Sequence, residues 1–313
     1  MTFASIVTPC YNEEDNVELL HSRIKAVMES LSDTIQDYEH IFIDNASKDK
    51  TVALLRKLAS QDKRVKVIVN SRNFGHIRSP FHGLLQAKGD LAIIMASDLQ
   101  DPPELIPQFV EKWQNGFKVV KGVKTNSDET FAMFAVRKTF YNLLNRISDN
   151  GIELTKNFTG FGLYDKCVLN ALREIDDPYP YFRGLVVEIG FEATEVEFTQ
   201  PRRKRGFSKN NFYTLWDIAM LGVVNHSKLP LRIGVFVGVM TAALSFVMGL
   251  IYLVLKLLYW DRFTAGTAPT LIGIFFVFSV QLVFMGLLGE YVGAILTQVQ
   301  KRPHVFEKER INF

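Results

Sequence analysis

The chain has few cysteines and little net charge, and both scarcities exclude classes of protein. Two cysteines, Cys10 and Cys167, occur among 313 residues. Their spacing matches neither a zinc motif nor the disulfide framework of a small secreted domain. The formal net charge is only +3, which does not indicate nucleic-acid binding. A Gly-x-Gly-x-x-Gly fingerprint is missing after the first predicted strand, so the usual dinucleotide-binding site is not indicated.

Apolar sequence is in excess, and it is concentrated in the last third of the chain. Hydrophobic residues make up 48% of the whole, and the mean hydropathy is +0.07. Residues 233–255 and 263–289 form uncharged runs of 23 and 27 residues. Each run is long enough to cross about 30 Å of hydrocarbon. We therefore predict two transmembrane helices, with buried helices of a soluble core as the alternative.

Basic residues flank these two runs on one side of the predicted membrane. They are Lys228 and Arg232 before the first run, and Lys301, Arg302, Lys308 and Arg310 after the second. The positive-inside rule then places both termini in the cytoplasm. The apolar stretch at the N-terminus is short and is followed by acidic residues, so we expect a strand there and no signal peptide.

The first 123 residues alternate short β-branched runs with longer helical patterns. Strands are predicted at 3–8, 40–44, 65–69, 91–95 and 118–123, and helices at about 14–31, 49–60, 77–88 and 103–115. Such alternation is typical of βαβ units. The sequence therefore predicts an α/β fold with a mostly parallel sheet.

Oxygen ligands directly follow the fourth predicted strand. Asp98 and Gln100 stand two residues apart, and ligands of open α/β sheets lie at the carboxyl ends of the strands. Carboxylate and amide oxygens suit Mg²⁺ or Mn²⁺. We predict a metal site here that holds a diphosphate. The alternative is that Asp98 and Asp101 cap the helix that Pro102 or Pro103 begins.

Polar residues also follow the first two predicted strands. Glu13 comes after the first, and Asp44 and Asn45 come after the second. On one sheet edge with the metal site, these side chains suit the base and ribose of a nucleotide diphosphate. Taken alone, residues 44–47 would form a turn with a helix N-cap in most proteins.

Four segments together resemble the successive motifs of family 2 glycosyltransferases. They are Pro9-Cys10-Tyr11-Asn12-Glu13-Glu14, Asp44-Asn45-Ala46-Ser47-Lys48-Asp49, Ser71-Arg72-Asn73-Phe74-Gly75 and Asp98-Leu99-Gln100-Asp101-Pro102-Pro103-Glu104. The chain is most similar to the polyprenyl-phosphate glycosyltransferases, the group of dolichol-phosphate mannose synthase and bactoprenol glucosyltransferase. The resemblance continues through Phe182-Arg183-Gly184, a basic loop from Arg202 to Lys209, both apolar runs and Gly289-Glu290-Tyr291, so it covers nearly the whole chain.

The resemblance implies a GT-A fold and an inverting transferase that moves a hexose from a nucleotide donor to a membrane lipid phosphate. A UDP-sugar with glucose is the favoured donor and undecaprenyl phosphate the acceptor. GDP-mannose or UDP-N-acetylhexosamine as donor remains an alternative.

The resemblance also implies site residues. Pro9, Tyr11, Glu13, Asp44 and Asn45 would hold the nucleotide, and Asp98 with Gln100 would bind Mg²⁺ or Mn²⁺. Lys124, Arg137 and Lys138 would clamp the acceptor phosphate, and Arg202, Arg205 and Lys209 would close over the donor diphosphate.

Three positions depart from the family's pattern. Asn45 stands where a second Asp is usual, and Ala96 replaces the first Asp of the metal motif. Gly160 replaces an Asp that is important in relatives. These losses leave a second interpretation open, in which the chain is a non-catalytic membrane scaffold that retains the nucleotide fold.

These patterns divide the chain into a cytoplasmic catalytic domain at 1–209 and a juxtamembrane amphipathic helix at 210–230. Transmembrane helices follow at 231–259 and 269–292, joined by a non-cytoplasmic loop at 260–268, with a cytoplasmic tail at 293–313. We expect a multi-pass protein of the inner (plasma) membrane that contacts membrane lipids. A homo-oligomer is expected, with a tetramer as one candidate, a flippase as a candidate partner and no nucleic acid.

Overall fold

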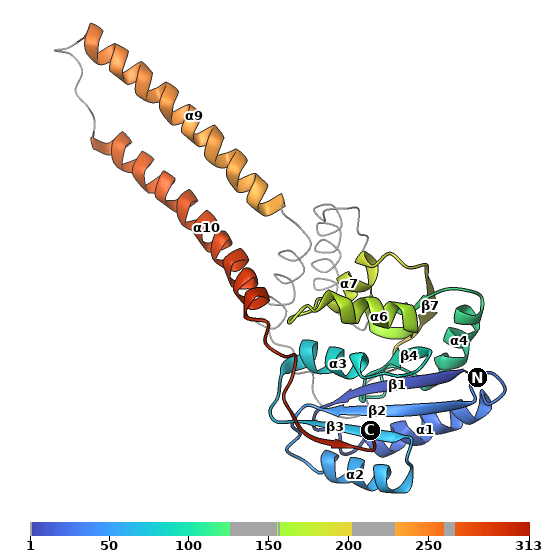
Figure 1. The fold of residues 1–313 in the computed structure, drawn as a ribbon. Coiled ribbons are helices and arrows are strands. Elements are labelled where there is room, and N and C mark those ends of the chain that lie inside the picture. Colours follow the sequence, from blue (N-terminus) through green and yellow to red (C-terminus); the bar gives the residue numbers. More distant parts are fainter. Residues whose placement is uncertain (1, 126–154, 156, 202–228, 260–266) are drawn as a thin grey trace.

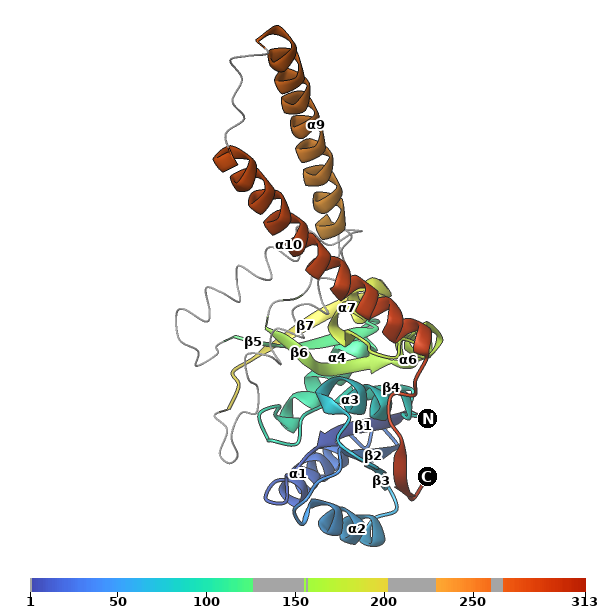
Figure 2. The same ribbon diagram turned by 90° about the vertical axis from the view of Figure 1, so that its left-hand side faces the viewer.

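A mixed sheet of eight strands organises the part of the chain that is described. The computed structural model describes residues 2–125, 155, 157–201, 229–259 and 267–313 (Figure 1). Within these residues the strand order is β7-β5-β6-β4-β1-β2-β3-β8. Helices cover both faces of this sheet, and two long helices extend away from it (Figures 1 and 2). The predicted juxtamembrane helix at 210–230 lies almost wholly outside the described residues.

The first half of the sheet is parallel and matches the predicted βαβ units. Its strands are β1 (Phe3–Cys10), β2 (Asp37–Asp44), β3 (Val65–Asn70) and β4 (Leu91–Ile94). The crossovers are α1 (Val17–Ser30), α2 (Thr51–Gln61) and α3 (Gly75–Leu85). A short 3₁₀ turn, η1 (Pro103–Leu105), leads into α4 (Ile106–Gln114) after β4. The predicted strands and helices of this half are therefore confirmed.

The second half of the sheet is mixed in direction. It contains β5 (Val119–Lys124), β6 (Phe158–Asp165) and β7 (Ala193–Phe198), with α6 (Lys166–Ile175) and α7 (Phe182–Glu188) between β6 and β7. The strand β6 runs antiparallel to both β4 and β5, and β7 runs parallel to β5. The sequence pattern predicts β5 but neither β6 nor β7. Their short polar and apolar alternation is a weak signal without the partner strands.

Alternate residues of the central strands enter two separate cores. Ile6 of β1 packs with Leu20 and Ile24 of α1, whereas the adjacent Val7 packs with residues of α3 and α6. Successive side chains of a strand point to opposite faces of its sheet. A strand covered on both faces therefore reads as a continuous apolar run, as β1 and β4 do.

Two helices are long and apolar enough to cross a membrane. These are α9 (Leu229–Leu258) and α10 (Thr267–Gln300), which at 1.5 Å per residue are about 45 and 51 Å long. The most apolar stretches are Leu229–Ile251 and Phe276–Gln300, of which 0% and 6% are buried. Helices in a soluble core would be mostly buried, so that alternative is wrong. Figure 2 shows both helices leaving the sheet domain on the same side.

The last strand returns the chain from α10 to the sheet. β8 (Glu307–Ile311) pairs antiparallel with β3, and this strand is not predicted by the sequence pattern. His82 of α3 fastens this strand, with Nε2 2.6 Å from the Glu307 carboxylate, and Arg310, within β8, donates to the same carboxylate at 2.5 Å. Burial raises the pKa of Glu307, but the hydrogen bonds from Arg310 and His82 outweigh burial and lower the pKa below 4.5.

We expect Glu307→Gln to lower the free energy of opening β8 by about 1 kcal/mol at neutral pH, because opening breaks the hydrogen bond between Glu307 and His82 and one such bond is worth about that much. Glu307 has a lowered pKa in the fold, so its contribution is present above the unfolded pKa and is lost as pH falls through the folded value. Hydrogen exchange of residues 307–311 at pH 7 and pH 3 measures this. The difference in protection between the wild type and the variant should become smaller from pH 7 to pH 3. Equal protection of both proteins at pH 7 would contradict the assignment, and Glu111→Gln on α4 serves as the control.

Candidate functional site

A gap in the sheet opens where β4 ends. β4 is paired with β1 only as far as Ile94 opposite Val7, and with β6 as far as Ile94 opposite Gly162. β1 continues to Cys10, and β6 begins at Phe158, so both neighbours extend beyond the end of β4. The strand order places β4 between them. The early end of β4 therefore separates β1 from β6 at the carboxyl edge of the parallel strands, where ligands bind in such sheets.

Loops with strained backbone follow three of the parallel strands. Asn12, Ala46 and Leu99 have φ angles of 56°, 62° and 61° and follow β1, β2 and β4, respectively. This left-handed conformation costs a residue with a side chain about 1–2 kcal/mol, and Asn bears it most easily. Strain of this kind persists only where the surroundings enforce it, and it gathers at functional sites.

Hydrogen bonds between the first two loops enforce that conformation. The Asn12 N–H donates to Ser47 Oγ at 2.9 Å, and the Lys48 N–H donates to Asn12 Oδ1 at 2.8 Å. Ser47 in turn donates from its backbone N–H and its hydroxyl to the carboxylate of Asp44. The loops after β1 and β2 thus form one interlocked unit.

Two predicted nucleotide contacts, Asp44 and Asn45, are buried in this unit. Asp44 has no exposed surface, and burial raises the pKa of its carboxyl while the hydrogen bonds from Ser47 oppose the rise. Asn45 accepts from the Phe74 N–H at 2.8 Å and donates to the Gly75 carbonyl at 3.0 Å. Both residues therefore shape the loops. Their contact with a nucleotide stays a prediction.

Glu13 lies in the same group of charges. Burial and then the carboxylates of Asp44, Glu13 and Asp49 raise the pKa of the Cys10 thiol, so these acidic groups surround the end of β1. Glu13 Oε2 accepts from Asn16 Nδ2 at 2.6 Å. Contact of Glu13 and Tyr11 with a nucleotide also stays a prediction.

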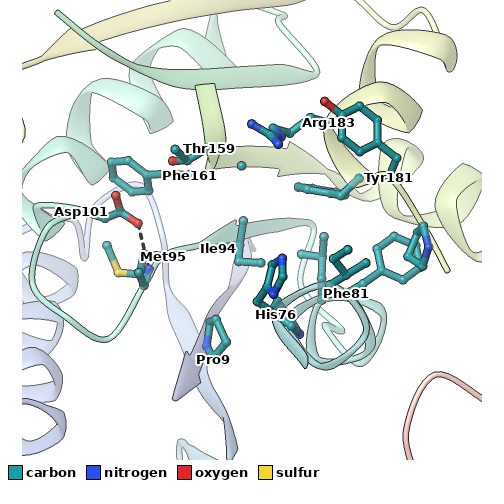
Figure 3. A pocket seen from close by; sticks show the side chains of 17 residues that line it. Pro9, His76, Phe81, Ile94, Met95, Asp101, Thr159, Phe161, Tyr181 and Arg183 are labelled. Carbon is teal, nitrogen blue, oxygen red and sulfur yellow. Dashed lines mark hydrogen bonds between the residues drawn. The ribbon is translucent and has the colours of Figure 1, made fainter. Parts of the chain in front are cut away.

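The predicted metal loop turns back on itself. Asp98 Oδ1 accepts from the Gln100 N–H at 3.2 Å, across the left-handed Leu99. Asp101 Oδ2 accepts from the Ala96 N–H at 2.9 Å, which is the dashed line in Figure 3. The N-cap of η1 is Pro102, with no side-chain hydrogen bond to the helix. The helix-cap alternative for Asp101 is therefore wrong.

Three charged groups converge at this loop. Burial, together with the carboxylate of Asp98, raises the pKa of Asp101 to about 6, although the hydrogen bond from the Ala96 N–H and the ammonium of Lys124 oppose the rise. Asp101 is only 6% exposed, so the charge of each neighbour acts on it with little screening. The structure thus brings Lys124, at the end of β5, to the loop that carries Asp98. Contact of Lys124 with an acceptor phosphate stays a prediction.

The acidic pair provides a donor set that fits a hard divalent cation. Asp98 and Asp101 offer carboxylate oxygens, and Gln100 offers an amide oxygen within the same loop. No group of three His, Cys, Asp or Glu side chains that could hold a metal ion occurs within the described ranges. Ligands for such an ion beyond these residues would have to come from a phosphate or from water, as is usual for Mg²⁺.

A cavity of about 340 Å³ occupies the gap left by β4. Pro9 and His76 lie on one side of it, Thr159 and Arg183 on the opposite side, and Asp101 at one end (Figure 3). The remaining wall is largely apolar. It consists of Ile77, Pro80, Phe81, Leu84, Ile94, Met95, Ala96, Gly160, Phe161, Pro180, Tyr181 and Phe182.

Packing around α7 builds the wall opposite β1. The Phe182 ring meets the edges of Phe81 and Tyr164 at centroid distances of 6.1 and 5.1 Å. The Tyr164 hydroxyl donates to the Gly160 carbonyl at 2.7 Å, deep in the protein. The Arg183 guanidinium lies 5.4 Å from the Tyr181 ring centroid and donates to the Phe158 carbonyl at 3.3 Å. These contacts hold Arg183 at the cavity.

Several expected site residues cannot be placed against this geometry. Arg137 and Lys138 lie within 126–154, and Arg202, Arg205 and Lys209 lie within 202–228, all outside the described residues. Of the others, Pro9 lines the cavity, and Lys124 and Asp98 adjoin Asp101.

The cavity is also lined by polar residues for which the sequence predicts no contact with a ligand. The sequence predicts Asp101 only as an alternative helix cap, and it predicts no role for Thr159 or Arg183. A signal for Arg183 was present, because Phe182-Arg183-Gly184 is one of the segments that carry the family resemblance. Its placement beside β4 needed the antiparallel strand β6, which the pattern does not reveal.

Comparison with known proteins gives matches over most of the chain. Residues 5–174, more than half of the sequence, match the glycosyl transferase family 2 model. Bactoprenol glucosyl transferase of Shigella phage SfII is 33% identical over 308 residues, which cover 97% of each chain. The glycosyltransferase YkcC of Bacillus subtilis is 34% identical over 300 residues, which cover 96% of this chain and 91% of the relative.

Among solved structures, glucosyl-3-phosphoglycerate synthase from Mycobacterium tuberculosis has 18% sequence identity and a TM-score of 0.45. The match covers 71% of this chain and 78% of that one. The family match, together with the mixed sheet, confirms the predicted GT-A fold. The family match and the relative named bactoprenol glucosyl transferase also show a transferase enzyme, which disagrees with the scaffold interpretation. The chain belongs to glycosyltransferase family 2.

Proposed function

We propose that this enzyme transfers a hexose, with glucose favoured, from a UDP-sugar to undecaprenyl phosphate at the cytoplasmic face of the membrane. One observation carries the proposal: Asp98, Asp101 and Lys124 converge at the end of β4, beside a mainly apolar cavity. The charged end suits a diphosphate and a phosphate, and the apolar wall suits the part of a lipid acceptor that adjoins its phosphate. The name of the phage relative, bactoprenol glucosyl transferase, supports both the sugar and the acceptor.

The proposed donor site is the edge formed by the interlocked loops after β1 and β2 and by the loop after β4. Pro9, Tyr11, Glu13, Asp44 and Asn45 belong to the two loops or strand ends that would hold the nucleotide. GDP-mannose and UDP-N-acetylhexosamine are the competing donors, because no contact among the described residues distinguishes the bases or the sugars.

A divalent cation is the proposed cofactor, held by Asp98 with Gln100 and adjoined by Asp101. When bound, Mg²⁺ or Mn²⁺ would neutralise negative charge on the leaving diphosphate. Lysine and arginine side chains of the protein would neutralise the negative charge that remains. Lys124 lies close enough to Asp101 to shift its pKa, and Arg183 lines the same cavity. Arg137, Lys138, Arg202, Arg205 and Lys209 are proposed to complete this positive lining.

Positioning, and not proton abstraction, is the proposed source of catalysis. A phosphate monoester has a second pKa near 6, so it is largely a dianion at neutral pH. One of its oxygens forms the bond to the anomeric carbon while the bond from that carbon to the diphosphate oxygen breaks. The electron pair leaves with the diphosphate, and no proton moves. The chain must then hold both phosphates in line and exclude water.

Glycine at position 160 is compatible with the proposed reaction, which needs no carboxylate base there. Its φ angle is +104°, a conformation that residues with side chains rarely adopt, although an added Cβ would lie 3.4 Å from Phe182 and not clash. The backbone here therefore favours glycine over the Asp seen in relatives. Because the acceptor is already ionised, the missing carboxylate removes no essential step.

The two long helices explain how the acceptor reaches the site. We propose that α9 and α10 span the membrane with both termini in the cytoplasm, since a polyprenyl chain cannot leave the bilayer. An added Cβ on Gly238 or Gly249 of α9 would meet no heavy atom within 4 Å, which leaves room for a second copy in a homo-oligomer. A flippase is the proposed downstream partner, because a sugar head group crosses hydrocarbon only at high cost.

A panel of labelled nucleotide sugars, each incubated with undecaprenyl phosphate and the full chain in detergent, tests the proposed reaction. We expect product from a UDP-hexose that requires Mg²⁺ or Mn²⁺ and disappears with chelator. Product from GDP-mannose alone would replace the donor assignment. No product from any donor would contradict the proposed acceptor.

Asp98→Asn keeps the size of the side chain and removes its charge, so we expect the rate of transfer to fall at least about 100-fold, as for loss of one strong electrostatic contact. The matched control is Asp33→Asn, on the exposed turn after α1, which should transfer at the wild-type rate. An Asp98→Asn enzyme with wild-type kcat and unchanged metal dependence would show that the metal is not held here.

Gly160→Ala and Gly160→Asp form a matched pair, because both impose the backbone strain and only one adds a carboxylate. We expect each to lower the free energy of unfolding by about 1–2 kcal/mol and neither to raise kcat. Thermal unfolding and initial rates measure the two effects. A higher kcat for Gly160→Asp than for Gly160→Ala would mean that a base contributes after all.

A further inference from the structure

The segment that follows α10 reaches the loop before α7, one wall of the cavity. Gln298, in the last turn of α10, donates from Nε2 to Asp177 Oδ1 at 2.8 Å. His304 Nε2 lies 2.8 Å from the Asp177 carbonyl oxygen, and since a carbonyl only accepts, this nitrogen carries the proton. Asp177 is 8% exposed. The end of α10 and the segment after it therefore bind Asp177 of the catalytic domain through both its side chain and its backbone.

Asp177 connects these contacts to the cavity wall. Its Oδ1 also accepts from the Tyr179 N–H at 2.9 Å, which closes a tight turn directly before the lining residues 180–183. Arg78 of α3 lies 5.1 Å from the Tyr179 ring centroid on the other side. A shift of Asp177 would thus move the backbone of residues 180–183, and with it the position of Arg183 at the cavity.

The same segment also touches the opposite wall. The His304 ring meets Phe81 of α3 edge-on, with centroids 5.2 Å apart. Phe81 is 3% exposed, lines the cavity, and packs against Phe182 of α7. One histidine therefore contacts the α3 wall through its ring and the α7 wall through its hydrogen bond.

Both ends of this segment are anchored, so it cannot slide freely. At its start α10 ends at Gln300, and Lys301 turns the chain with a φ angle of 44°. At its end the Ser71 N–H donates to the Phe306 carbonyl at 2.8 Å, and β8 pairs with β3 from Glu307 onward. The segment 301–306 is short, and a chain this short between two fixed points has little conformational freedom.

We propose that Asp177, Gln298 and His304 are positioning residues through which α10 sets the spacing of the cavity walls for the lipid acceptor. The inference rests on the proposed function, since it assigns the cavity to the acceptor. The acceptor's phosphate is confined to the membrane surface, and the cavity must meet it there. Because the cavity walls are attached to α10, the cavity keeps a fixed orientation relative to the membrane surface. The acceptor phosphate then meets the cavity without a prior reorientation of the sheet domain.

Gln298→Glu tests the first contact with almost no change in size. It replaces the donor with a carboxylate that faces Asp177 Oδ1, so attraction becomes repulsion. We expect KM for undecaprenyl phosphate to rise about 5- to 10-fold, the usual worth of one such hydrogen bond, with KM for the nucleotide sugar unchanged. The matched control is Gln300→Glu, an exposed residue of the same turn, which should leave both constants at wild-type values.

Two substitutions of His304 separate its contacts. His304→Phe keeps a ring against Phe81 and loses the donor, whereas His304→Gln keeps a donor for the Asp177 carbonyl and loses the ring. If both walls are set by this residue, each variant raises the acceptor KM, and donor hydrolysis by water in the absence of acceptor proceeds at the wild-type rate. The melting temperature of the full chain in detergent is the control for a purely structural effect.

The outcomes distinguish this inference from the proposed function. If the wild type transfers sugar to undecaprenyl phosphate and Gln298→Glu has a wild-type acceptor KM, the positioning role is wrong and the proposed function stands. Equal rises in donor and acceptor KM, or a fall in melting temperature that accounts for the loss, would also overturn it. If the wild type transfers no sugar to this lipid, the proposed function itself fails.

Discussion

The site depends on one constraint in the sheet, namely that β4 ends before the strands on either side of it. Because β1 and β6 both extend past Ile94, the sheet divides at its carboxyl edge, and the division cannot close without the missing ladder of hydrogen bonds. Side chains of α3 and α7 line the space, and the chain leaving β4 must turn sharply at Leu99 to pass around it. The cavity, the strained loop and the acidic residues follow from that single early end.

The charges at the end of β4 include a buried carboxyl group, that of Asp101, which water cannot solvate. Asp101 is held by the Ala96 N–H, and its pKa of about 6 records the cost of a buried carboxyl near Asp98, eased by Lys124. Asp98 and Asp101 place an excess of acidic groups in one loop. Such a surplus is what a cation bound with an anionic diphosphate would complement.

The attachment of α9 and α10, the proposed membrane helices, addresses a different problem. A glycosyltransferase with a soluble acceptor needs no fixed orientation, whereas a lipid acceptor presents its phosphate at one depth only. The chain returns from α10 into the sheet as β8, and on the way it contacts Asp177 and Phe81 at the cavity. The sheet domain is thus joined to its anchor by a strand and a set of side-chain contacts, and not by a linker alone.

Much of the fold follows from the sequence alone. The apolar runs of β1 and β4, the helical patterns between the parallel strands and the two uncharged segments depend on local periodicity, and all of them form as expected. The motif residues at strand ends also gather at one edge, because parallel strands place their carboxyl ends together. The family could be identified in this way because the motifs retain their order and spacing.

Only the tertiary structure decided the rest, because it depends on contacts between distant segments. The strand β8 pairs across more than 200 residues of sequence with β3, and its five residues carry no pattern that sets it apart from a polar tail. Asp44 and Asn45 are predicted ligand contacts in the sequence, and only the structure shows that their side chains also accept hydrogen bonds from the Ser47 and Phe74 N–H groups of the surrounding loops. Arg183 and Asp101 face one cavity only because antiparallel β6 lies beside β4, and pairing of that kind is a long-range property that no local pattern encodes.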